Sequence, residues 1–528
     1  MNPESTAAHS PLRRRAMLSI CFGTFLEWYD FLTFASLVTY FGVLFYPPDR
    51  PVAALLASLA TFGVGMLVRP LGALVFGSLG DRHGRRVVFI TTLVLMGVAT
   101  FGVGMLPTYS QIGLGAPILL LLLRLLQGFA AGGEIGGAGV YLAEHAPADR
   151  RGFFTCGLQL MGPLGIMAST AQIVALQAWL PEADFKAWGW RIPFLLSALL
   201  LLISLKSRVA LYESPIFTAL RQRKALATTP FRDCLRDRVT RNRMLLLFFC
   251  LSAGGSLLFF SSQVYLTVFL KNVVRLDPTM ASGLVLASTL ALFPMTLFFG
   301  WLSDHVGRRP VTLAGLLLGC LLLIPVAQGL LHYGNPALAQ FNHSVPVQIW
   351  GANCDYNGWT EARNACERTQ AQLPQWGVAY QVHPQASDVP LQVQVGQSTR
   401  LHGENPAVLH ATLEAAGWPA QADASQVRWF PMLLLLLLPA LAYVLATAPQ
   451  TATFAELFPT RSRYSAVGVP HNLSAGWIGG LSPLVVTMLN VKFGVPGLGL
   501  WYVVAMLALA FLVGFFFMPE TRHASLSD

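Results

Sequence analysis

Long apolar runs, separated by short polar turns, follow one another along almost the whole chain. A run of about 20 apolar residues crosses the roughly 30 Å hydrocarbon core of a bilayer as a helix. Backbone groups in that core have no water to bond, so a crossing run is expected to be helical. The pattern predicts twelve membrane-spanning helices, at 17–46, 52–79, 87–107, 115–143, 153–180, 191–211, 244–270, 279–302, 311–333, 428–455, 464–490 and 496–518.

Two short motifs occur twice and divide these spans into two halves. The segment from Gly77 to Arg86 has the form G-x-L-x-D-x-x-G-R-R, which returns 223 residues later from Gly300 to Arg309. Each copy is a polar turn between two apolar runs. A second form, E-x-x-P-x-x-x-R, runs from Glu144 to Arg151 and returns 312 residues later from Glu456 to Arg463. We therefore predict a duplicated six-helix unit.

The second offset is the longer one because the second half carries an insertion. Between Gly334 and Val427 the chain becomes polar, with alternating stretches such as Val389 to Val395, and holds three basic and seven acidic residues. The predicted organisation is an N-terminus at 1–16, a six-helix half at 17–211, a linker at 212–243, helices seven to nine at 244–333, the insert at 334–427, helices ten to twelve at 428–518, and a C-terminus at 519–528.

Composition and charge agree with a membrane protein and indicate its orientation. Apolar residues make up 54% of the chain and charged residues only 11%, against about 25% charged in soluble domains. Basic residues mark cytoplasmic connections, and between Lys206 and Arg243 there are ten of them against three acidic residues. We expect a multi-pass bacterial inner-membrane protein, working as a monomer, with both termini and the linker cytoplasmic and the insert outside. The net charge of +10 fits this topology and contact with membrane lipid, and gives no reason to expect a nucleic-acid partner.

Cysteine usage separates the insert from the rest of the chain. Cys354 and Cys366 are the two cysteines of the insert. In an oxidising compartment such a pair in a small domain favours a disulfide, and two free thiols are the alternative. The histidines of the insert lack finger-like spacing, so no metal site is predicted.

Five charged residues lie deep inside predicted spans, away from the basic residues near the span ends. They are Glu27 and Asp30 in the first span, Arg69 in the second, and Arg124 and Glu134 in the fourth. A charge at membrane depth is costly and faces a bundle interior or a water-filled cavity, so these residues are either functional or structural ion pairs. Glu27 and Asp30, three residues apart, share a helix face. The glycines around Glu134 indicate close helix packing.

Together these features resemble the major facilitator superfamily and, within it, the metabolite:H+ symporter family. The resemblance covers essentially the whole chain except the insert. It implies an all-α integral membrane protein with twelve transmembrane helices in two six-helix halves, and the polar external insert then lies between helices nine and ten. It also implies secondary transport by alternating access, with a proton as coupling ion and no cofactor. The segments that carry it, besides the repeated turn motif, are Leu26 to Phe31, Arg124 to Glu134, Tyr141 to Glu144 with Arg151, Glu213 to Pro215, and Pro519 to Arg522.

We predict a proton-coupled importer of a small organic acid, a di- or tricarboxylate or a shikimate-like compound. Glu27, Asp30 and Glu134 are the candidates for proton coupling, because each carboxyl group can change its protonation during the cycle. Arg69 and Arg124 are the candidates for the substrate carboxylate, which a guanidinium bonds bidentately. Further predicted substrate-binding residues are Tyr29, Gln127, Gln263, Tyr265, His471 and Asn472.

The resemblance also implies a cytoplasmic latch that holds the two halves together in the outward-open state. Its predicted members come from the two repeated motifs of each half. They are Asp81, Arg85, Arg86, Glu144 and Arg151 in the first half, and Asp304, Arg308, Arg309, Glu456 and Arg463 in the second.

Other functions stay open at this point. Symport of a zwitterionic osmolyte such as proline or betaine is one alternative, weakened because no C-terminal coiled coil follows Arg522. Gly162-Pro163 in the fifth span partly resembles the Gly-Pro motif of exchangers, so an exchanger or efflux transporter is a second alternative. Thr24, which stands where the family has asparagine, is a separate departure from the family pattern. A non-transporting sensor that binds ligand through the insert is a third. The sequence holds no phosphate-binding loop and no nucleophile–base pair that spacing identifies, so we do not expect an enzyme.

Overall fold

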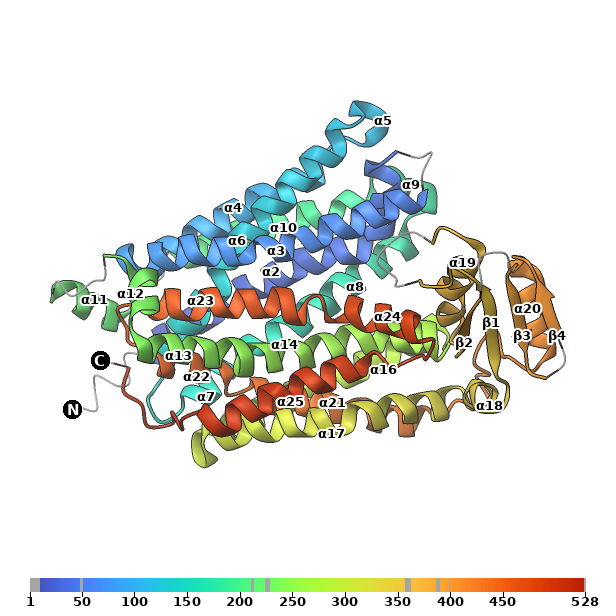
Figure 1. Ribbon diagram of the computed structural model, residues 1–528. Helices are drawn as coiled ribbons and strands as arrows, with labels where there is room; N and C mark the ends of the chain where they lie inside the picture. Colours follow the sequence, from blue (N-terminus) through green and yellow to red (C-terminus); the bar gives the residue numbers. More distant parts are fainter. Residues whose placement is uncertain are drawn as a thin grey trace.

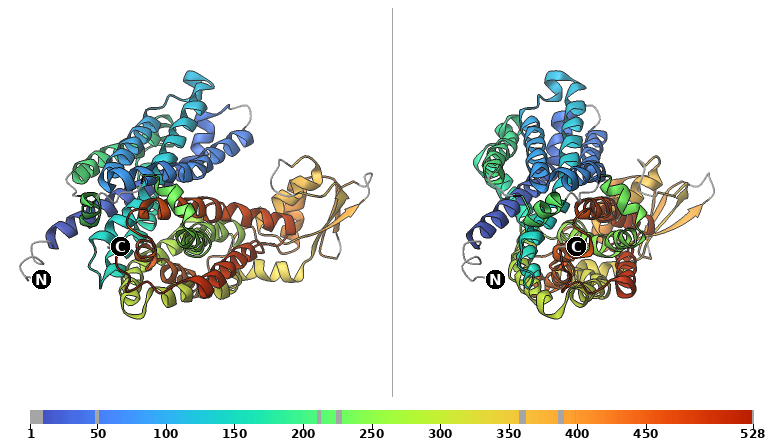
Figure 2. Two further views of the ribbon diagram at one scale, coloured as in Figure 1. Left: turned by 60° about the vertical axis from the view of Figure 1, so that its left-hand side comes forward. Right: turned by 90° about the vertical axis from the view of Figure 1, so that its left-hand side faces the viewer.

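The computed structural model describes residues 10–47, 51–209, 213–223, 228–356, 362–385, 390–397 and 399–526. Two bundles of long helices lie side by side, and a small α/β domain projects from one end of the second bundle (Figure 1). Both termini and the linker helices lie at the opposite end. The two further views in Figure 2 show the same division into two bundles.

The first bundle contains six long helical stretches, and we call it the N-half. Short helices α5 (Tyr109–Ile112) and α9 (Glu182–Ala187) connect its members at the end remote from the N-terminus. The long stretches are α2 (Ser10–Phe45), α3 (Pro51–His83), α4 (Arg85–Met105), α6 (Gly115–His145), α7 (Arg151–Cys156) continued by η1 (Gly157–Leu160) and α8 (Met161–Trp179), and η2 (Gly189–Arg191) continued by α10 (Ile192–Val209).

The second bundle, the C-half, follows linker helices α11 (Pro215–Gln222) and α12 (Pro230–Arg236). Its first and fifth spans contain wider π-helical turns, which are frequent at functional sites. Its spans are α13 (Arg238–Leu246) with η3 (Leu247–Ser252), α14 (Ala253–Phe259), η4 (Phe260–Tyr265), α15 (Leu266–Val268) and η5 (Phe269–Val273); α16 (Pro278–Val306); α17 (Arg308–Gly334); α21 (Trp429–Thr447) with α22 (Gln450–Leu457); α23 (Arg463–Leu473) with η7 (Ser474–Gly479) and α24 (Ser482–Phe493); and α25 (Leu500–Phe517).

The helices coincide with the predicted spans. Within the described ranges, eleven helical stretches are long and apolar enough to cross a membrane. Helix α2 lies at the place of the predicted first span. Both halves therefore have six helices in the order that the repeat predicts.

The repeated turn motif ends one helix and begins the next in the same way in both halves. Gly84 and Gly307 have φ angles of 110° and 118°, a region that favours glycine. Glu213 accepts hydrogen bonds from the first two backbone N–H groups of α4, at 3.0 and 3.3 Å. Glu520 does the same for α17, at 2.9 and 3.1 Å. A carboxylate at a helix N-terminus stabilises the helix, so each turn has its own cap.

The insert is a small α/β domain with its own apolar core. Its sheet has the order β2-β1-β3-β4, in which β1 and β2 are parallel and the other pairs antiparallel. Cys354 and Cys366 form a disulfide, with Cα atoms 5.3 Å apart. The elements are α18 (Pro336–Ser344), β1 (Val347–Ala352), α19 (Ala365–Gln372), η6 (Leu373–Trp376), β2 (Gln381–Gln385), β3 (Gln392–Val395), β4 (Thr399–His402) and α20 (Pro406–Ala415).

Several polar contacts fix the insert to the C-half. The guanidinium of Arg275, just after η5, donates through Nε to the carbonyl of Ala420 at 2.9 Å. The backbone N–H of Tyr380 donates to the carbonyl of Gly494 at 2.8 Å. Asn335 Nδ2 donates to the carbonyl of Val274, also 2.9 Å away. The insert is therefore held as an extension of the C-half.

Labelling of single cysteines tests the predicted orientation. Ala407 in the insert and Thr228 in the linker are both exposed. We expect Ala407→Cys to react with an impermeant maleimide in intact spheroplasts, and Thr228→Cys to react only after the membrane is opened. Labelling of Thr228→Cys in intact spheroplasts would contradict the orientation.

Removal of the disulfide should destabilise the insert alone. For a loop of this length the chain-entropy model gives about 3 kcal/mol. We expect the double substitution Cys354→Ser with Cys366→Ser to increase proteolysis within the insert and to leave melting of the helical bundle unchanged. Peptide mapping without reduction provides the direct check, and recovery of both cysteines as alkylated thiols would contradict the bond.

Candidate functional site

At the end that carries the termini, an aspartate of the N-half caps a helix of the C-half. Asp81, at the end of α3, accepts hydrogen bonds from the backbone N–H groups of Tyr464 at 3.2 Å and Ser465 at 2.9 Å. These groups lie in the first turn of α23. Arg85 lies 3.4 Å from the Asp81 carboxylate and 3.5 Å from that of Glu144, so the cap is part of a buried charge cluster.

The C-half forms the reciprocal contact. Asp304 of α16 accepts hydrogen bonds from the N–H groups of Gly152 and Phe153, at the start of α7, both at 2.8 Å. Arg308 lies 2.7 Å from Asp304 and 3.3 Å from Glu456. Each half therefore uses its motif aspartate to hold a helix N-terminus of the other.

Two further arginines connect the clusters to the opposite half. Arg463 lies 3.0 Å from Glu144, and Arg151 lies 3.6 Å from Glu456. All of these side chains are nearly or fully buried. We call this closed contact the interlock, and its members are Asp81, Arg85, Glu144, Arg151, Asp304, Arg308, Glu456 and Arg463.

The other two predicted latch residues lie outside the interlock. Arg86 donates to the carbonyl of Val209 at 2.5 Å, and Arg309 donates to that of Phe515 at 2.6 Å. Each carbonyl belongs to the last turns of a helix in the same half. The structure therefore gives Arg86 and Arg309 a helix-capping contact within their own half in place of the predicted contact between halves.

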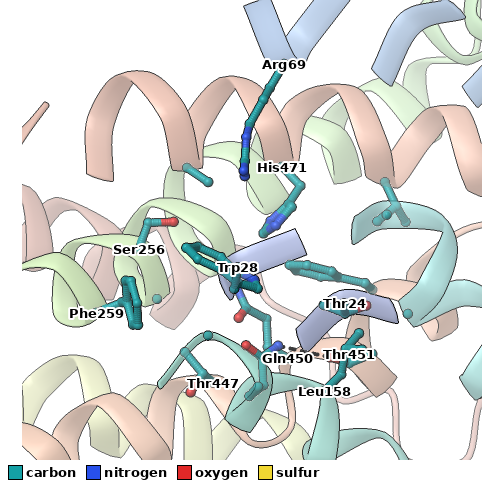
Figure 3. A pocket seen from close by; sticks show the side chains of 18 of the residues that line it. Thr24, Trp28, Arg69, Leu158, Ser256, Phe259, Thr447, Gln450, Thr451 and His471 are labelled. Carbon is teal, nitrogen blue, oxygen red and sulfur yellow. Dashed lines mark hydrogen bonds between the residues drawn. The ribbon is translucent and has the colours of Figure 1, made fainter. Parts of the chain in front are cut away.

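A cavity lined by residues of both halves lies between them (Figure 3). Among its described lining residues, Arg69 is the one side chain with a permanent charge. The Arg69 guanidinium lies 3.3 Å from the Glu27 carboxylate and 4.9 Å from the ring centre of Phe31. Arg69 points toward His471 and Trp28. The cavity thus has one cation, with a fully buried carboxylate behind it.

Aromatic side chains form much of the remaining wall. Trp28 and Phe259 have ring centres 5.5 Å apart, and Phe259 lies 5.7 Å from Tyr443 and 5.2 Å from Phe260. Phe454 packs against the cavity histidine, His471, at 5.3 Å. The wall therefore offers several aromatic faces to a bound molecule.

Several polar residues on the C-half side of this cavity were not predicted from the sequence. Gln450 donates to the carbonyl of Leu251 at 2.8 Å, and Thr451 accepts from Gln159 at 2.9 Å. Thr447 and Ser256 also line the cavity, as does Thr24, which was noted only as a departure from the family. The signal was available, because Thr447 to Thr453 is a polar stretch inside an otherwise apolar span.

Arg124 and Asp30, by contrast, belong to a closed network inside the N-half. Arg124 Nη1 donates to Gln127 Oε1 at 2.7 Å, and Gln127 Nε2 donates to Thr100 at 2.7 Å. Thr100 in turn donates to Asp30 at 3.0 Å, and Ser197 also donates to Asp30. The Arg124 guanidinium lies over the ring of Phe34. This network does not line the cavity, so the structure gives no support to substrate contact by Arg124 or Gln127.

Four other predicted substrate residues also bond elsewhere. Tyr29 donates to Gln172 of α8. Within the C-half, Gln263 accepts from Thr289 at 2.9 Å and Tyr265 accepts from Asn490 at 2.9 Å. Asn472 donates to the carbonyls of Gly132 and Gly468 at 3.0 and 2.9 Å, and so connects the halves. Of the predicted substrate residues, the structure places Arg69 and His471 at the cavity.

Glu134 forms a buried ion pair with Arg208 of α10. Arg208 passes over α2 at Gly23, where a Cβ atom would lie 1.7 Å from its Nη2. The absence of a side chain at Gly23 therefore makes room for the pair. Like Asp30, Glu134 lies off the cavity wall.

The sequence of the chain is similar to those of known transporters. Residues 16–238 match the family model described as sugar (and other) transporter. A putative proline/betaine transporter of Staphylococcus aureus (strain MSSA476) is 37% identical over 309 residues, 57% of this chain and 65% of the relative. The proline/betaine transporter of Escherichia coli K12 is 34% identical over 319 residues, 59% and 64% of the two chains. The match thus covers just under two thirds of these relatives.

Solved structures support the fold. The proton:xylose symporter XylE matches with a TM-score of 0.61 and 17% identity, over 98% of both chains. A partially occluded inward-open structure of XylE from E. coli matches with a TM-score of 0.60 and 16% identity, over 98% of this chain and all of that one. The predicted fold of two six-helix halves is therefore confirmed.

Proposed function

We propose that this chain is a transporter of the major facilitator superfamily and that it imports a small zwitterionic osmolyte such as betaine or proline together with protons. The relatives named as proline/betaine transporters support this substrate class. They favour the osmolyte alternative over the organic acid predicted first. We further propose that it works as a monomer in the bacterial inner membrane, needs no cofactor, and uses the proton as its coupling ion.

The charge balance of the cavity carries the proposal. Arg69 supplies one positive charge, and Glu27, 3.3 Å away, supplies a negative charge only while it is ionised. A di- or tricarboxylate would bring two or three negative charges into a site with a single described cation, and uncompensated buried charge is strongly unfavourable. A zwitterion brings one carboxylate for Arg69 and no net charge.

The aromatic wall suits the other end of such a substrate. A quaternary or secondary ammonium group is attracted to aromatic faces within about 6 Å of the ring centre. Trp28, Phe259 and Tyr443 provide such faces beside the cavity. In the proposed complex the carboxylate bonds Arg69 and the ammonium group lies against these rings.

The Glu27–Arg69 pair also provides a route to proton coupling. While Glu27 is ionised it neutralises Arg69, which then has less attraction for a substrate carboxylate. A proton on Glu27 ends this competition and leaves Arg69 available. Proton and substrate therefore favour each other's binding, as linkage requires. In this proposal Asp30 and Glu134 stabilise the N-half, and Glu27 is the coupling residue.

Uptake into proteoliposomes tests the proposal. We expect radiolabelled glycine betaine or proline to accumulate when an inward proton gradient is imposed, and accumulation to collapse with a protonophore. Citrate and shikimate serve as comparison substrates under the same gradient. Accumulation of citrate without betaine or proline would contradict the proposal, and gradient-driven efflux of betaine would favour an exchanger.

Variants of Trp28 provide a second arm. Trp28→Leu removes an aromatic face, so betaine binding should weaken about 3- to 30-fold, the range that a cation–π contact gives. Trp28→Phe keeps a ring and should retain most of the affinity. Equal losses in both variants would indicate packing, with no recognition of the ammonium group.

A further inference from the structure

The first turn of α23 places a tyrosine in a slot made by glycines of the N-half. Tyr464 is 1% exposed. A Cβ atom on Gly80 of α3 would lie 2.7 Å from its ring, and one on Gly137 of α6 would lie 2.0 Å from its hydroxyl. The hydroxyl donates to the backbone carbonyl of Gly133 at 2.5 Å. The ring fits between α3 and α6 because both positions are glycine.

The same residue contacts the interlock and a buried ion pair. Its backbone N–H donates to Asp81, as described above. Its hydroxyl bonds the carbonyl of Gly133, whose peptide bond leads directly into Glu134, the partner of Arg208. Tyr464 therefore spans the distance between the interlock and a charge pair inside the N-half.

The other side of the interlock has the opposite arrangement. By the internal repeat, Gly80 corresponds to Ser303 and Tyr464 corresponds to Gly152. A Cβ atom on Gly152 would lie 2.4 Å from Ser303 Oγ. On this side Gly152 takes the place of Tyr464, and Ser303 takes the place of Gly80. Gly152 therefore has no side chain that could reach into the opposite half.

We propose that Tyr464 is a positioning residue that makes the α3–α23 side of the interlock respond to the Glu134–Arg208 pair, while the α7–α16 side closes independently of that pair. When the interlock opens, α23 separates from α6 and Tyr464 leaves its slot. A shift of α6 at Glu134 changes how well the Tyr464 ring fits between α3 and α6. It therefore changes the fraction of molecules in the closed state. The inference depends on alternating access, which is part of the proposed function. It does not depend on which substrate is carried.

Two native cysteines report on the two sides separately. Cys234 of α12 is 1% exposed, with Sγ 3.8 Å from the carbonyl of Ser462, just before α23. Burial raises the pKa of Cys234 to about 11, so its reactive thiolate is scarce while this side is closed. Cys156 lies on the other side, where a Cβ atom on Gly300 would meet its Sγ at 2.6 Å.

Maleimide labelling of the full chain without added osmolyte tests the proposal. The protein keeps its disulfide, carries serine in place of the other free cysteines, and holds either Cys234 or Cys156 as the reporter. We expect Tyr464→Phe, which loses one hydrogen bond, to raise the Cys234 labelling rate about two- to tenfold and to leave Cys156 unchanged. Glu134→Gln should also raise the Cys234 rate, and the double variant should label no faster than Tyr464→Phe alone.

An unchanged Cys234 rate in Tyr464→Phe would overturn the proposal. So would additive effects of Tyr464→Phe and Glu134→Gln, because they would show that the two residues act independently. Since no osmolyte is present, failure of betaine uptake would count against the proposed function and would leave this result standing.

Replacement of Gly80 and Tyr464 by the residues found at the corresponding positions on the other side provides the matched control. Gly80→Ser alone should place its side chain against the Tyr464 ring and give fast Cys234 labelling. Gly80→Ser with Tyr464→Gly reproduces the pair found on the other side, so closure should return, and Glu134→Gln should then have no effect. If the double variant melts normally but labels as fast as Gly80→Ser, the slot is not what holds this side closed. If it does not fold, the Tyr464→Phe comparison decides.

Discussion

Replacement of Arg69 by glutamine should weaken osmolyte binding by two to three orders of magnitude. The cavity offers a substrate carboxylate one described cation, and loss of one partner of a buried charge pair costs about 3–5 kcal/mol. Arg69→Lys keeps the charge and loses the bidentate geometry, so we expect an intermediate affinity. Equilibrium binding of radiolabelled betaine to purified protein measures both effects.

Two controls separate recognition from general damage. Arg124→Gln removes a cation of the same half that is equally buried, and it should lower the melting temperature while leaving affinity nearly unchanged. Arg69→Gln with Glu27→Gln restores the charge balance without restoring a cation. If that double variant binds betaine normally, Arg69 serves only to neutralise Glu27 and the proposed carboxylate site is wrong.

Replacement of Glu27 by glutamine should abolish uphill accumulation while betaine exchange continues. The amide cannot take up and release a proton, and Arg69 then keeps its charge available for the substrate throughout the cycle. We expect binding to be retained and to lose its dependence on pH. Proteoliposomes give both measurements: uptake driven by a proton gradient, and counterflow with betaine on both sides.

Asp30→Asn is the matched comparison for this prediction. Asp30 is as buried as Glu27, but its partners are Thr100 and Ser197 in the closed network of the N-half. Its loss should lower stability and leave accumulation coupled to the proton gradient. If Asp30→Asn uncouples transport and Glu27→Gln does not, the coupling carboxyl lies in the network and the role of Glu27 is structural.

The sequence predicts the spans and the interlock residues well, for physical reasons. A span needs a minimum length of apolar chain, so hydropathy alone locates it. Asp81 and Asp304 stand out because their motif occurs twice. Their partners are backbone N–H groups of Tyr464 and Gly152 and of the residues that follow them. Every residue except proline carries such a group, so no sequence pattern marks these partners.

The substrate site was harder to predict, because depth in the membrane does not show which way a side chain points. Arg69 and Arg124 are both buried cations of the N-half, but the i+3 neighbour of Arg124 is Gln127, which bonds it inside the bundle. Gln450 and Thr451 were not predicted because an uncharged polar residue is less costly inside a membrane than a charge, so its position in a span is a weaker sign of function. The proposed substrate class rests on the charges that meet in the cavity, and no sequence pattern shows which charges meet there.

The attachment of the insert to the C-half has a practical consequence for measuring the motion. Arg275, Asn335 and Tyr380 anchor the insert to the C-half. The insert should therefore move together with the C-half as one rigid body. A dye on β4 therefore moves through a longer path than any dye on the helices themselves. Paired with a second dye on α5, at the far end of the N-half (Figure 1), it would let single-molecule fluorescence count opening events one turnover at a time.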